Sequence, residues 1–166
     1  QGSCELVLVS GYSGVGKTSI VNEILQQLTH HKGYFTSGKF DQFQRNIPLV
    51  ALMQAYRGLI RQLLSENDNQ LQYWRDRFLA YLGVNAQLII DAIPELELII
   101  GPQPPVPELG AIETTHRLVH TFNQFAQVFQ SPDHPIVLFM DDTQWTDSAS
   151  LQSLQSYMAD TNNHYN

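Results

Sequence analysis

A glycine-rich octapeptide near the start of the chain constrains its fold more than any other feature. Residues 11–18 read Gly-Tyr-Ser-Gly-Val-Gly-Lys-Thr, which matches the pattern Gly-x4-Gly-Lys-Thr in full. A short apolar run at residues 6–9 precedes it, and apolar residues at helical spacing follow it over residues 19–28. Strand, glycine turn and helix in this order are the context in which such a loop wraps a phosphate. The full match and both flanking elements favour a P-loop over an accidental glycine-rich turn.

The residue types in this loop suit the binding of a polyphosphate. Glycines allow the backbone to turn its N–H groups inward, in conformations that a Cβ would obstruct. The following helix adds about half a positive charge at its N-terminus. Lys17 would reach the β- and γ-phosphates, and the Thr18 hydroxyl would coordinate Mg²⁺. The predicted nucleotide-binding residues are Gly11, Ser13, Gly14, Val15, Gly16, Lys17, Thr18 and Ser19.

A second motif lies far along the chain, where the apolar run at residues 136–140 ends in two aspartates. The carboxyl ends of parallel strands line the crevice in which open α/β sheets bind ligands. We therefore predict that Asp141 holds Mg²⁺ and that Asp142 orients and deprotonates an attacking water. Lys17 and Asp142 are the predicted catalytic residues. The competing interpretation is that the aspartates only cap the end of a strand.

Between and beyond these motifs, periodicity predicts one more strand and several helices. The predicted second strand covers residues 34–40 and the predicted helices cover residues 48–65, 70–82, 87–93, 111–129 and 147–159, the last capped by Asp147 or Ser148. Four prolines within residues 101–107 predict an extended connector. The predicted fold class is α/β, a P-loop NTPase with a partial parallel sheet of three strands. A helical insertion with its connector, residues 48–131, would separate the P-loop strand, its helix and the second strand (1–47) from the acidic strand and the helix that follows it (132–166).

Composition and the absence of certain motifs limit the classes of ligand and partner that we expect for this chain. The formal net charge is -7, from nine Lys and Arg against sixteen Asp and Glu, which argues against a nucleic-acid partner. No apolar run approaches the roughly 20 residues that span a bilayer, so we expect no membrane partner. The single cysteine excludes an intrachain disulfide and suits a cytoplasmic location. No Asn-Lys-x-Asp sequence is present to select guanine, so ATP is the expected nucleotide.

Taken together, the motifs resemble the ATPase module of the AAA+/STAND class, which is related to origin-recognition ATPases. The closest resemblance is to the version found in bacterial signalling proteins between a serine/threonine kinase domain and GAF and histidine-kinase domains. This resemblance extends over nearly the whole chain. The stretches that match are residues 11–17, 37–48 and 93–107 and Asp141-Asp142-Thr143-Gln144-Trp145-Thr146-Asp147. In the last stretch, Thr143 and Thr146 stand where the family usually has Leu and Ala.

This resemblance implies an ATP-dependent regulatory module of a sensor kinase, whose partners are other domains of the same polypeptide. Self-association stays open. The resemblance also implies a sensor strand between the P-loop strand and the acidic strand, followed by a helical lid, and we expect both to be absent from these 166 residues. The chain alone should then bind nucleotide weakly and hydrolyse it very slowly or not at all. A non-catalytic scaffold that responds to nucleotide, and a small-molecule P-loop kinase, are the alternatives.

Several other side chains have two interpretations each. Gln144 could contact the γ-phosphate or be solvated, and Trp145 is expected to anchor the loop by packing. Lys39 and Arg45 could reach a phosphate or a neighbouring subunit or serve only the surface. His116 and His120 share a helix face, but without a third ligand we expect a packed or solvated pair. The arginines that could serve as an arginine finger in trans are Arg57, Arg61, Arg75 and Arg77.

Overall fold

The computed structural model describes Ser19, Glu23 and residues 33–130 and 134–162. Ser19 and Glu23 are both helical. The regular elements of the described part are β1 (Tyr34–Lys39), α2 (Val50–Leu63), α3 (Asp68–Leu82), η1 (Gly83–Asn85), α4 (Ala86–Ala92), η2 (Pro94–Leu96), α5 (Glu97–Ile100), α6 (Ala111–Gln127), β2 (Ile136–Asp141), η3 (Thr143–Trp145) and α7 (Ser148–Asn162).

The two described strands pair in parallel, as the sequence predicts. Their register runs from Tyr34 beside Ile136 to Lys39 beside Asp141. A parallel pair requires a long crossover connection, and here helices α2 to α6 all lie in that connection. The predicted α/β class with helices between the second strand and the acidic strand is therefore confirmed. The predicted first strand, residues 6–9, lies outside the described residues.

Helix α2 packs closely on β1 because small residues let the two backbones approach. The Thr36 hydroxyl donates a hydrogen bond to the carbonyl of Ala55 at 2.5 Å. A Cβ placed on Gly38 would lie 2.6 Å from the carbonyl oxygen of Ala51, and one on Gly58 would meet the Thr36 hydroxyl. The alternating burial of β1 follows from this packing, since Tyr34, Thr36 and Gly38 are all buried.

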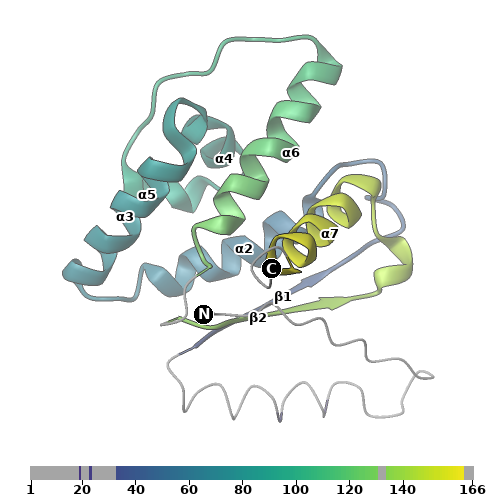
Figure 1. The fold of residues 1–166 in the computed structure, drawn as a ribbon, viewed down its shortest axis with the longest axis horizontal. Helices are drawn as coiled ribbons and strands as arrows, with labels where there is room; N and C mark the ends of the chain where they lie inside the picture. Colours follow the sequence, from purple (N-terminus) through teal and green to yellow (C-terminus); the bar gives the residue numbers. More distant parts are fainter. Residues whose placement is uncertain (1–18, 20–22, 24–32, 131–133, 163–166) are drawn as a thin grey trace.

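The remaining helices build an aromatic core on the side of α2 away from the sheet, while α7 lies beside α2 over the sheet (Figure 1). The side chains of Trp74, Phe78, Phe122 and Phe125 are fully buried. Phe78 of α3 stacks on Phe125 of α6 at 5.6 Å between ring centroids. Burial of such rings supplies much of the driving force for folding.

Helix boundaries differ from the sequence predictions by a few residues, for local reasons. Helix α2 begins at Val50 and not at Pro48, because Leu49 adopts a left-handed conformation. Helix α3 begins at Asp68, two residues early, because the Asn67 side chain accepts the amide of Gln70 and caps it. Helix α7 continues to Asn162. The sequence analysis missed η2 and α5, although Leu96, Ile99 and Ile100 have helical spacing and are buried.

The acidic strand is less buried than predicted. The apolar run at residues 136–140 predicts a buried strand, yet each of these residues is half-buried. In the described part of the sheet, β2 has one hydrogen-bonded neighbour, β1. Within the same part, none of the helices combines the length and apolarity needed to cross a membrane.

Candidate functional site

The two predicted acidic residues lie at the carboxyl end of β2. Asp141 is the last residue of the strand and is exposed. Asp142 follows in a left-handed conformation, with φ 52° and ψ 43°, and its amide donates a hydrogen bond to Oδ1 of Asp141 at 2.8 Å. This turn places the two neighbouring carboxylates at the sheet edge where ligands of parallel α/β folds bind.

The end of β1 places a positively charged side chain beside these two carboxylates. Lys39 lies beside Asp141 in the register, and its Nζ is 3.2 Å from Oδ2 of Asp142. The Lys39 side chain is 68% exposed and that of Asp142 is 36% exposed, so solvent screens the pair and it contributes about 1 kcal/mol or less. The sequence left Lys39 with two interpretations, contact with a phosphate or neighbouring subunit and a surface role; in this structure it is an exposed residue whose partner is the predicted general base.

Residues 141–147, the acidic loop, are held together by short-range hydrogen bonds. Gln144 donates from Nε2 to Oδ1 of Asp142 at 3.4 Å, and the amide of Trp145 donates to the carbonyl of Asp142 at 3.0 Å. The Thr146 hydroxyl donates to the carbonyl of Thr143 at 2.6 Å. Gln144 is thus exposed but in contact with the predicted base.

Asp147 joins the acidic loop to two helices. Its buried carboxylate accepts the Ser150 amide at 2.9 Å through Oδ1 and the Ser150 hydroxyl at 2.6 Å through Oδ2. Asp147, rather than Ser148, is therefore the N-cap of α7. Oδ1 also accepts the amide of Leu49, 98 residues away, at 3.3 Å. Sequence reasoning found the cap but had no signal for the contact with Leu49.

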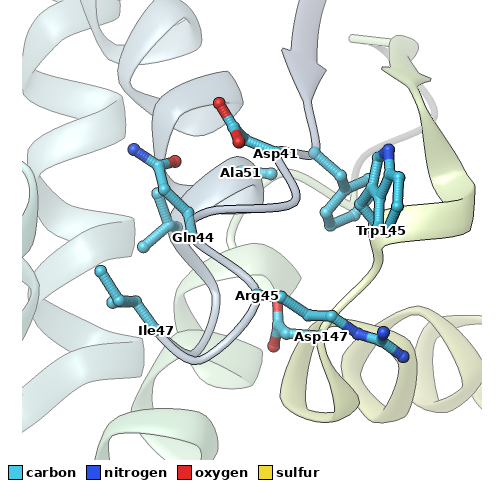
Figure 2. Close-up of a pocket in the computed structure, with 9 residues that line it drawn as sticks. Asp41, Gln44, Arg45, Ile47, Ala51, Trp145 and Asp147 are labelled. Carbon is cyan, nitrogen blue, oxygen red and sulfur yellow. The ribbon is translucent and has the colours of Figure 1, made fainter.

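A small pocket separates the acidic loop from residues 40–49, the connecting loop between β1 and α2. Figure 2 shows residues that line it: Trp145 and Asp147 belong to the acidic loop, and Asp41, Gln44, Arg45 and Ile47 belong to the connecting loop. Its volume of about 10 Å³ has room for about one water. Trp145 is half-buried there, consistent with the predicted packing role.

The predicted P-loop residues other than Ser19 lie outside the described residues: Gly11, Ser13, Gly14, Val15, Gly16, Lys17 and Thr18. Ser19 is helical and exposed, as expected for the start of the helix that follows the loop. The structure therefore brings Asp141, Asp142 and Lys39 together at the carboxyl end of the parallel pair.

The acidic end of β2 has the donor chemistry that Mg²⁺ prefers. Mg²⁺ is usually held by one or two carboxylates together with waters and substrate phosphates. Asp141 offers an exposed carboxylate of this kind. Among the described residues, no group of three or more His, Cys, Asp or Glu side chains could hold a metal ion. The residues present therefore fit a metal shared with a phosphate better than a metal held by protein ligands alone.

Three of the four candidate arginines have intramolecular partners. Arg57 and Arg61 of α2 contact one carboxylate oxygen of Glu95 at 2.6 and 2.7 Å. Partial burial opposes ionisation of Glu95, but hydrogen bonds from Arg57, from its own backbone and from Arg61 lower its pKa to about 2. Arg77 donates to the carbonyl of Val128 at 2.8 Å. Arg75 is exposed on α3.

The predicted histidine pair lies at the opening between two helices. His116 and His120 of α6 are both exposed, and they line a hollow of about 350 Å³ together with Asn123 of α6 and Gln152 of α7. As stated above, no group of three or more His, Cys, Asp or Glu side chains in the described part of the chain could hold a metal ion.

Comparison with known proteins extends this picture to the whole chain. Residues 1–165 match the family described as "AAA ATPase domain". The chain belongs to this family. Membership implies the P-loop NTPase fold that the glycine motif and the parallel strands predict, and it confirms the resemblance stated above.

The curated relatives are histidine kinases. The chain is 37% identical over 158 residues, 95% of its length, to hybrid signal transduction histidine kinase G of Dictyostelium discoideum. It is 24% identical over 164 residues, 90% of its length, to histidine protein kinase 1 of Candida albicans. The matched regions are 4% and 7% of those proteins, so the chain spans only a small part of their length. No solved structure matches the chain.

Proposed function

We propose that the chain is the Mg-ATP-binding regulatory module of a multidomain signal-transduction kinase. The observation that carries the proposal is the acidic end of β2: two adjacent carboxylates at the carboxyl edge of a parallel pair, in an AAA ATPase family member with a complete P-loop motif. The printed names of the relatives support a signalling context and other domains of the same polypeptide as partners.

We assign the contacts with the triphosphate and its Mg²⁺ to two motifs, the P-loop and the acidic end of β2. Main-chain amides of residues 13–19 hold the phosphates, and the Lys17 ammonium contacts the β- and γ-phosphates. Thr18 and Asp141 hold Mg²⁺, the second through the water shell of the ion. Bound Mg²⁺ would neutralise charge on the phosphate oxygens.

Asp142 is the proposed general base. Its carboxylate lies at the exposed edge of the sheet, where it can accept a proton from a water and align that water with a bound γ-phosphate. In this structure it is ion-paired with Lys39. This contact favours the alternative of a scaffold in which bound nucleotide sets conformation without turnover. Asp142→Asn separates the two: loss of signalling by the full-length kinase with retained ATP binding favours hydrolysis as the function.

Nucleotide titration tests the binding proposal. The chain should bind ATP more tightly than GTP, and more tightly with Mg²⁺ than without it. Lys17→Ala should weaken ATP binding at least about tenfold, because hydrogen bonds to a charged group contribute roughly 1.5–3 kcal/mol.

Arg75→Ala is the matched control, since it removes an exposed cation from α3 and should leave the affinity unchanged. Equal affinities of the wild type and Lys17→Ala, or no ATP binding by calorimetry, would contradict the proposal.

A further inference from the structure

A hollow lined mainly by polar side chains lies between helices α6 and α7, which are neighbours in the fold (Figure 1). Its lining includes His116, His120 and Asn123 from α6 and Ser148 and Gln152 from α7. The volume of about 350 Å³ is several times the roughly 30 Å³ that one water occupies in the liquid. The hollow therefore has room for an ion together with several waters.

The two histidines have the spacing of a chelating pair. His116 and His120 are one helical turn apart, so their Cβ atoms are about 5–6 Å apart on the same face of α6. Both side chains are exposed, and among the described residues neither has a hydrogen-bond or ion-pair partner. Imidazole nitrogen is a favoured ligand of Zn²⁺, Cu²⁺ and Ni²⁺. Nothing in the described part of the chain therefore competes with a metal ion for this pair.

Asn123 distinguishes this pair from two solvated histidines. It lies about one turn beyond His120 on the same helix and lines the same hollow. Its Oδ1 atom is buried and, among the described residues, has no hydrogen-bond partner. A buried acceptor without a partner costs free energy. A water bound to a metal ion would be a strong donor to this atom, because the ion makes the water more acidic.

The charges around the hollow do not oppose a cation. None of the residues that line it is a lysine, an arginine, an aspartate or a glutamate. Arg117, which lies between the two histidines in sequence, donates to the carbonyl of Pro107 at 3.0 Å. The first turn of α7 carries a partial positive charge, but the Asp147 carboxylate caps it through Ser150. A divalent ion therefore meets no uncompensated positive charge among these residues.

We propose that His116 and His120 bind a divalent transition-metal ion of the Zn²⁺ type. Among the described residues no third His, Cys, Asp or Glu completes a ligand group, so waters fill the remaining positions of the ion. One of these waters donates to Asn123, and others face Gln152 across the hollow, so the bound ion links α6 to α7. This inference goes beyond the proposed function and uses none of the residues proposed to bind nucleotide.

Calorimetric titration of the metal-free 166-residue chain with Zn²⁺, in the absence of nucleotide, tests the site. The site is the binding event that disappears in both His116→Ala and His120→Ala. Asn123→Ala should weaken this event about tenfold, as expected when a group that holds a metal-bound water or ligand is removed. Asn123→Asp keeps an acceptor and should retain binding. Zn²⁺ should also raise the melting temperature of the wild type more than that of either histidine variant.

The matched control is an exposed pair with the same spacing on another helix. Gln72 and Asp76 of α3 are both exposed and lie outside the lining of the hollow. Gln72→His and Asp76→His are introduced together with His116→Ala and His120→Ala. Because this new pair has no buried acceptor beside it, it should bind Zn²⁺ about tenfold more weakly than the wild type does.

Three results would overturn the inference. Zn²⁺ binding that is the same in the wild type, His116→Ala and His120→Ala would show that the pair is not a metal site. Equal affinities of the wild type and the α3 control would mean an adventitious ion only, bound by spacing alone. Equal affinities of the wild type and Asn123→Ala, with unchanged circular dichroism, would show that the hollow contributes nothing to binding.

Discussion

Glu95 shows how single side chains in this chain depend on their charged neighbours. Its carboxylate receives hydrogen bonds from Arg57 and Arg61, which hold its pKa at about 2, below the ordinary value of 4.5. A depressed pKa means that the folded state binds the proton less tightly than the unfolded state does. The stabilisation is therefore complete above about pH 4.5 and is lost as the pH falls toward 2.

We predict that Glu95→Gln destabilises the protein by about 1 kcal/mol near neutral pH, a modest value because both arginines are partly exposed. The difference in melting temperature between wild type and variant should shrink as the pH is lowered from 6 to 3. Glu97→Gln, at an exposed position of α5, is the control and should show no such trend. A difference that is independent of pH would mean that the Glu95 charge contributes nothing.

Gly38 is a second residue whose identity is set by its neighbours. We predict that Gly38→Ala destabilises the protein by about 1–3 kcal/mol, because the new Cβ would meet the backbone carbonyl of Ala51. Urea unfolding measures the change. In Gly110→Ala the new Cβ meets only the end of the flexible Glu113 side chain, so we expect a change within about 0.5 kcal/mol. Equal effects of the two substitutions would contradict the close packing of α2 on β1.

At the scale of elements, the loop between β2 and α7 connects parts of the chain that are far apart in sequence. Asp147 caps α7 through Ser150 and also binds the amide of Leu49 before α2. One buried carboxylate therefore links the start of α7 to the residue that precedes α2. This arrangement gives the acidic strand a structural link to the connecting loop.

We predict that Asp147→Ala destabilises the protein by about 2–3 kcal/mol, the sum of a lost helix cap and a buried amide left without a partner. Ser148→Ala changes an exposed neighbour in the same turn and should be close to neutral. Chemical denaturation of both variants checks this. A loss for Asp147→Ala no larger than that of an ordinary cap, about 1 kcal/mol, would show that the Leu49 contact is dispensable.

At the scale of the whole molecule, the acidic end of the sheet is open to solvent among the described residues. Asp141 is exposed and Asp142 is partnered by Lys39. Arg57, Arg61 and Arg77 are tied to Glu95 and Val128, so they would have to leave these partners to stabilise charge on a phosphate. In the part of the chain that the structure describes, nothing encloses the acidic loop, and an open site of this kind gives a reacting phosphate little electrostatic stabilisation.

We therefore predict that the purified chain releases phosphate from Mg-ATP far more slowly than about 1 s⁻¹, the lower end of typical enzyme turnover. Phosphate-release assays should give a rate close to that of Asp142→Asn. Turnover near 1 s⁻¹ that disappears in Asp142→Asn would contradict this prediction, and would show that the carboxylates act efficiently without further elements.

Sequence reasoning succeeded where the signal is local. Both described strands, the apolar run that ends in two aspartates, and the five helices α2, α3, α4, α6 and α7 follow from patterns over a few residues or turns. It failed where neighbours decide: α5 is too short for its period to stand out, and the half-burial of β2 depends on what packs against it. No local pattern could have paired Lys39 with Asp142 or Leu49 with Asp147, because these contacts join residues about a hundred positions apart.

The sequence by itself determined which segments could become strands and helices, and where phosphate-binding and acidic motifs stand along the chain. These properties follow from side-chain periodicity and from the backbone freedom of glycine, which neighbours in sequence are enough to define. Only the tertiary structure decided which carboxylate Lys39 meets, that Asp147 supports two helices, and that Leu49 is held in a left-handed conformation. Such contacts depend on how β1, α2 and β2 pack together, because close packing leaves each of these side chains few alternative positions.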